Sequence, residues 1–71
     1  MISMHQSVLV IRDVPAQHVT KGMVGAVIEV FEFPKRAFEV EFVDEEGRPI
    51  VQATLAEDDL EAVASGVPGT E

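Results

Sequence analysis

The chain has 71 residues, of which 13 are acidic and five are basic, and its net charge is −8. A chain of this length forms one domain, near the size at which a single apolar core gives only marginal stability. The absence of cysteine excludes disulfide and thiolate chemistry, and neither His5 nor His18 has a second histidine at ligand spacing, so we expect no metal and no cofactor.

The charge is unevenly distributed along the chain. Residues 1–36 carry four basic and three acidic side chains, a balance of +1, whereas residues 37–71 carry Arg48 against ten acids, a balance of −9. Nucleic-acid binding depends on Lys and Arg that neutralise phosphates, so this composition disfavours it. The acids either keep a small protein in solution or form a contact surface for a basic partner.

The composition also bears on location. Apolar residues make up 46% of the chain, which is typical of a folded domain. No stretch approaches the roughly 20 consecutive apolar residues that span a bilayer. Residues 1–5 lack the basic region and cleavage site of a secretory signal. We therefore expect a cytoplasmic protein with no membrane segment.

The first strand is predicted over residues 7–14, because Val8–Ile11 is a short apolar run rich in β-branched residues. Two glycines then mark the entry to the next strand. Gly22 supplies a positive φ in the turn. Gly25, inside the apolar pattern, indicates a bulge or a close approach of two backbones.

Three strands follow in succession. Residues 24–32 form the longest predicted strand, and residues 37–43 return with strict alternation of apolar and charged side chains. The acidic segment 44–47 ends in glycine and has the composition of a tight hairpin turn. A fourth strand is expected over residues 48–55.

The end of the domain is short. A helical turn over residues 56–59 is expected before a last strand over 60–63. The folded domain then spans residues 7–63, between a flexible N-terminus (1–6) and a flexible C-terminal tail (64–71). We see no internal repeat and no second domain.

These elements together predict the fold. Five short antiparallel strands in so small a chain describe an all-β protein whose sheet bends strongly to enclose its own core. Their order and spacing, with a 3-10 turn before the last strand, indicate a small five-stranded antiparallel SH3-like barrel.

Three segments resemble a family of small bacterial domains of unknown function. They are KGMVGAVIEV over residues 21–30, EVEF over 39–42 and TLAEDDL over 54–60. Met23 departs from the acidic residue expected at that turn position. The resemblance covers roughly residues 7–63 and implies a fold but no activity. Some members are encoded beside toxin-like proteins, which implies an antitoxin or immunity role.

The segment Gly22–Val27 also resembles a short motif of ribosomal and transcription-factor small barrels that touch RNA. Those domains carry basic loops. Here the corresponding loops hold only Lys21, Lys35 and Arg36, set against an acidic hairpin. A nucleic-acid-binding small barrel is therefore the alternative to a protein-binding one.

Strand pairing predicts which side chains form the core. A turn centred on Lys35 places Val30 opposite Val40, and a turn at Glu46 places Phe42 opposite Val51. Both registers direct the same side of the third strand inward. The expected core is Ile28, Val30, Phe38, Val40, Phe42, Val51, Ala53 and Leu55, closed by Leu9, Ile11, Leu60 and Val63.

Alternation at a period of two then defines an outer face. Val27, Val43 and Ile50 are expected to form an exposed apolar row, with Phe31 and Phe33 further along the strand. Contiguous apolar patches usually mark contact surfaces. Alternatively, the first strand or the curl of the barrel covers part of this row.

The outer face is also expected to hold glutamates. Glu29 is predicted opposite Glu41, with Glu39 two residues along. Like charges across strands destabilise a sheet unless they are offset by solvent, by Lys or Arg of a partner, or by Lys35 and Arg36 of a second copy. Paired carboxylates can also serve catalysis, but the outside of so small a barrel offers no concave, water-excluding site. We expect no catalytic residues.

We therefore interpret the chain as a non-enzymatic protein-interaction module. It would act as a homo-oligomer or as an antitoxin-like or accessory partner of another protein. An accessory domain that shapes an enzyme's substrate channel cannot be separated from this interpretation by sequence. The interface residues predicted above are Val27, Phe31, Phe33, Val43, Ile50, Glu29, Glu39 and Glu41.

Overall fold

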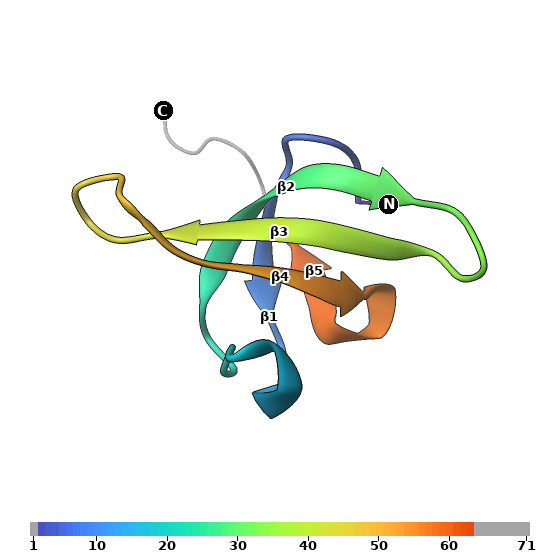
Figure 1. Ribbon diagram of the computed structural model, residues 1–71, viewed down its shortest axis with the longest axis horizontal. Helices are drawn as coiled ribbons and strands as arrows, with labels where there is room; N and C mark the ends of the chain where they lie inside the picture. Colours follow the sequence, from blue (N-terminus) through green and yellow to red (C-terminus); the bar gives the residue numbers. More distant parts are fainter. Residues whose placement is uncertain (1, 64–71) are drawn as a thin grey trace.

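A computed structural model of the protein describes residues 2–63 as one antiparallel sheet with two short 3-10 helices (Figure 1). The strands are β1 (Ser7–Val10), β2 (Val24–Phe31), β3 (Ala37–Val43), β4 (Pro49–Ala56) and β5 (Leu60–Ala62), and the 3-10 helices are η1 (Pro15–Gln17) and η2 (Glu57–Asp59). The predicted C-terminal tail, 64–71, lies outside the described residues.

The strand order in the sheet is β4-β3-β2-β1-β5. The prediction of an all-β fold with five antiparallel strands and a 3-10 turn before the last strand is confirmed. The order is compatible with an SH3-like barrel. In Figure 1, β3 and β4 cross in front of β1 and β5, and β2 curves between these two parts of the sheet.

A β-bulge in β2 changes which side chains face the core. Val27 pairs with Val40, but Glu29 pairs with Glu39, so β2 has one extra residue, Ile28, at this point. An extra residue bends the strand and reverses the alternation of its side chains. Val27 is therefore fully buried, while Glu29 remains exposed.

Gly25 allows β2 to lie very close to β3. A Cβ atom at this position would be 2.7 Å from a methyl group of Val40, 2.8 Å from the backbone oxygen of Glu41 and 2.8 Å from the ring of Phe42. No side chain fits at these distances unless the neighbours move. The predicted close approach at Gly25 is thus confirmed, and the bulge lies three residues further along β2.

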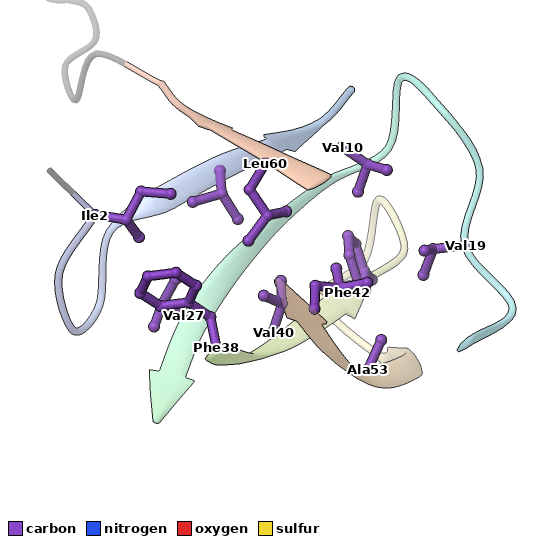
Figure 2. Packing of buried hydrophobic residues seen from close by; sticks show 11 residues of the cluster. Ile2, Val10, Val19, Val27, Phe38, Val40, Phe42, Ala53 and Leu60 are labelled. Atoms are coloured by element: carbon purple, nitrogen blue, oxygen red, sulfur yellow. The ribbon is translucent and has the colours of Figure 1, made fainter. Parts of the chain in front are cut away.

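The core consists of eleven buried apolar side chains, and the described residues include no buried polar residue. The core residues are Ile2, Val8, Val10, Val19, Val27, Phe38, Val40, Phe42, Ala53, Leu55 and Leu60 (Figure 2). The predicted core positions on β3, two of those on β4, and Leu60 are confirmed. Val30 and Val51, also predicted, pack partly buried against this cluster.

The core predictions for β1 and for the start of β2 were wrong by one residue. Val8 and Val10 are buried, whereas Leu9 is half-buried and Ile11 is exposed. Val27 is buried in place of Ile28. Both errors arise from the bulge in β2. Because β1 pairs with the part of β2 that precedes the bulge, its inward-facing residues follow the alternation of Val27 and not that of Val30.

The two hairpins differ in how well their registers were predicted. In the β3–β4 hairpin, Phe42 faces Val51 as expected. In the β2–β3 hairpin, Val30 faces Phe38 rather than Val40, because the turn is centred on Pro34 instead of Lys35. A shift of two residues leaves each side chain on its own face of the sheet. Only the bulge moves a side chain to the other face.

The first residues, expected to be flexible, pack against the sheet over residues 2–6. Ile2 is only 5% exposed and belongs to the core. The His5 N–H donates to the Val27 carbonyl at 2.7 Å, and the Val27 N–H donates to the Gln6 carbonyl at 2.9 Å. The N-terminal segment therefore satisfies both backbone polar groups of the buried residue at the bulge.

We predict unequal stability effects for two valines on β2. Val27→Ala should lower the free energy of unfolding by roughly 2 kcal/mol, because it removes buried methyl groups and leaves a cavity. Val24→Ala, at a position that is 55% exposed, should change it by less than about 0.5 kcal/mol. Urea unfolding followed by circular dichroism measures both. Equal losses would contradict the placement of the bulge.

Candidate interaction surface

The outward side of β2, β3 and β4 is the part of the molecule that best fits a binding site. Along β3, Phe38, Val40 and Phe42 are almost completely buried. The alternate residues of the same strand therefore point outward. We define the outer face by Glu29 and Phe31 of β2, by Glu39, Glu41 and Val43 of β3, and by Ile50, Gln52 and Thr54 of β4.

Three glutamates lie in the middle of the outer face. Glu29 is directly opposite Glu39. On its other side, Glu39 faces Thr54, whose hydroxyl donates to the carboxylate at 2.6 Å. Glu41 faces Gln52 and not Glu29. A pair of facing glutamates was predicted, but its second member is Glu39, because the hairpin register differs by two residues.

None of the ion pairs among the described residues neutralises these glutamates. Arg12 pairs with Asp59 at 3.3 Å, and Arg48 pairs with its neighbours in the β3–β4 hairpin. The guanidinium of Arg36 lies 5.8 Å from the centroid of the Phe38 ring. Apart from the hydrogen bond that Glu39 accepts from Thr54, the three carboxylates thus depend on solvent for their stabilisation.

Exposed apolar side chains lie at both ends of the outer face. At one end, Phe31 is 39% exposed, and Phe33 in the adjoining turn is 88% exposed. At the other end, Val43 is 46% exposed and Ile50 is 60% exposed. Ile50 is the extra residue of a second bulge, since Phe42 pairs with Val51 but Val43 pairs with Pro49.

Val27, the eighth predicted interface residue, is not on the outer face. It is 0% exposed and lies among the core side chains shown in Figure 2. The predicted apolar row of Val27, Val43 and Ile50 therefore does not exist. Val24, which was not predicted as an interface residue, is 55% exposed on the same strand. Gly25 was the sequence signal that could have revealed the exposure of Val24, because it indicated an irregularity beside that residue.

The edge of β4 is partly blocked. The Thr54 N–H, which points away from β3, donates to the side-chain oxygen of Gln17 at 2.9 Å. The Ala56 N–H donates to the Asp59 carboxylate at 3.1 Å. Side chains from η1 and η2 thus occupy donors that an added strand would need. The sequence carries no local signal for the contact of Gln17, which spans 37 residues.

The β3–β4 hairpin holds a shallow hollow lined by Asp44, Glu45, Glu46 and Arg48. The Asp44 carboxylate accepts the N–H groups of Arg48 and Glu46, both at 2.9 Å. The pKa of Asp44 is lowered, chiefly by the hydrogen bond from the Arg48 amide. Desolvation acts in the opposite direction, and the hydrogen bonds from the Glu46 amide and the Arg48 side chain lower the pKa further. The side chains of Asp44, Glu46 and Arg48 thus make hydrogen bonds and ion pairs that stabilise the turn.

Comparison with known proteins identifies the family. Residues 4–62 match the family described as a domain of unknown function, DUF4926. The chain belongs to this family. No curated protein matches the chain. No solved structure matches it either.

Two further findings concern the described part of the chain, residues 2–63. It contains no helix that is long and apolar enough to cross a membrane. It also contains no group of three or more His, Cys, Asp or Glu side chains arranged to hold a metal ion.

We predict a graded effect of charge at position 29. Glu29→Gln should raise the free energy of unfolding by a few tenths of a kcal/mol at low salt, because it removes repulsion with Glu39 and leaves the Thr54 bond intact. Glu29→Lys should raise it further, because it creates a cross-strand ion pair. Urea unfolding at low and high salt measures both, and the differences should shrink at high salt. A loss of stability in both variants would contradict the facing pair.

Proposed function

We propose that this protein is a non-enzymatic protein-interaction module that binds another polypeptide through the outer face. One observation supports the proposal most strongly. Four side chains at the two ends of this face, Phe31, Phe33, Val43 and Ile50, are between 39% and 88% exposed. Scattered apolar residues are normal on a surface, but apolar residues grouped around one face usually mark an interface.

The shape of the surface supports a binding role over a catalytic one. Glu29, Glu39 and Glu41 lie on adjacent strands of the outer face, where Glu29 is exposed and Glu39 and Glu41 are half-buried. Catalysis by paired carboxylates needs a site that excludes water and shifts the pKa of one group. A broad exposed face suits contact with a macromolecule.

The proposed role covers a homo-oligomer and an accessory or antitoxin-like partner of a second protein. Both would act in the cytoplasm, as the sequence predicts. In either case the outer face is the surface that becomes buried. The alternative role in nucleic-acid binding has less support, because the centre of this face presents three carboxylates to any phosphate.

Site-specific photocrosslinking in the native host tests this proposal. A photoreactive phenylalanine analogue would replace Phe31 or Ile50 on the outer face. The matched control is Ile11, which is 38% exposed, almost the same as Phe31 at 39%, but lies beyond the end of β1. We expect a discrete adduct from positions 31 and 50 and none from position 11.

The mass of the adduct reports the occupant, because a second copy adds 7.7 kDa and another polypeptide adds its own mass. The absence of an adduct from the outer face would overturn the proposal. So would equal yields from all three positions, since they would indicate random collisions.

A further inference from the structure

We infer that the occupant of the outer face is a cationic amphipathic helix of a partner protein, with basic side chains in its middle turns and apolar side chains toward its ends. This inference rests on the proposed function, because it names the partner of the same surface. It follows from the charges at the centre of the face, from the spacing of the apolar residues and from the blocked edge of β4.

The glutamates require an occupant that brings positive charge. Glu29 and Glu39 face each other across β2 and β3, and Glu41 follows on the same side of β3. A partner that covers this face removes the water on which the carboxylates now depend. Burying unpaired charges is strongly unfavourable. Lys or Arg side chains placed between the glutamates would offset that cost.

A second copy of the chain does not meet this requirement. In a two-fold dimer the same patch meets itself, so six glutamates would be brought together in a complex of two chains that each have a charge of −8. Arg12 and Arg48 are already in ion pairs, and Arg36 lies against Phe38. The remaining cations, Lys21 and Lys35, lie in turns before and after β2.

The spacing of the apolar residues sets the length of the partner segment. Phe31 faces Ala37, at the start of β3, and Val43 is at its end. Six residue steps along a strand span roughly 20 Å. A helix of about 13 residues has this length. Apolar side chains at its two ends would contact Phe31 and Val43, and basic side chains between them would contact the glutamates.

The edge of β4 favours a helix over an added strand. A partner strand would need the Thr54 and Ala56 N–H groups, which already donate to Gln17 and Asp59. The face itself offers side chains and no free backbone groups. Helices commonly cover an exposed sheet face by side-chain packing. The partner segment therefore lies across the face.

Binding of designed peptides to the full chain tests the inference. The probe is a helical peptide of about 18 residues with lysines in its middle turns and leucines near both ends. The matched control peptide has glutamate in place of lysine. Calorimetric titration at about 50 mM and about 300 mM salt measures affinity. We expect the lysine peptide to bind, more weakly at high salt, and the glutamate peptide not to bind.

Two triple variants separate a specific site from general attraction to an acidic protein. E29Q/E39Q/E41Q removes the carboxylates of the outer face, and E57Q/D58N/E61Q removes three exposed carboxylates elsewhere, so both change the net charge equally. We expect the first to weaken binding about tenfold and the second by less than about twofold. Equal weakening would overturn the inference. The unfolding midpoint of each variant reports whether it is folded.

A charge swap gives a gain of binding that misfolding cannot imitate. E29K/E41K should bind the glutamate peptide and lose affinity for the lysine peptide, while Glu39 keeps its bond from Thr54. If the lysine peptide does not bind but residues 31 and 50 crosslink in cells, the partner class is wrong and the interaction module stands. If those crosslinks contain two copies of this chain or nucleic acid, the inference is also overturned.

Discussion

The structure depends on the bend of β2, which pairs with β1 through its first residues and with β3 along most of its length. Two local features make the bend possible. Gly25 leaves no side chain where Val40 and Phe42 approach, and the extra residue Ile28 lets the strand turn without losing its pairing. A five-stranded sheet of 62 described residues can enclose a core only if it curls in this way.

The bend also determines what the outside of the molecule presents. Because Val27 points inward, the middle of the outer face holds glutamates and no apolar row. On this face, the exposed apolar side chains lie at the ends, near the two turns that flank β3. This arrangement favours a long amphipathic partner over a compact apolar contact. Gln17 and Asp59 accept hydrogen bonds from N–H groups at the β4 edge, which disfavours a partner that would add a strand there.

The sequence predicts the elements that local chemistry determines. The β3 range and the β3–β4 register follow from strict alternation and a short acidic turn ending in glycine. The range is confirmed, and the register is confirmed as far as the Phe42–Val51 pair, beyond which Val43 pairs with Pro49 and not with Ile50. The bulge at Ile28 leaves no such pattern, because β2 is apolar on both sides of it and either alternation fits. The core role of Ile2 and the contact of Gln17 depend on long-range packing. Of the predicted outer-face residues, Val27 is therefore the one that lies in the core.

The register across the bulge can be measured directly by nuclear Overhauser contacts between Hα protons. The Thr54 N–H donates to Gln17 and not to Glu39 opposite it, so the backbone of the next residue, Phe38, is the one that bonds to β4. Val30 and Phe38 therefore form a pair without mutual hydrogen bonds. Their Cα atoms should then be about 4.5 Å apart. Val27, whose backbone groups bond to Gln6 and His5, forms a second pair of this kind with Val40 on the other side of the bulge. We predict strong Hα–Hα contacts for both Val30–Phe38 and Val27–Val40. A contact of Val40 with Ile28 in place of Val27 would contradict the account, because β2 would then have no extra residue between the two pairs.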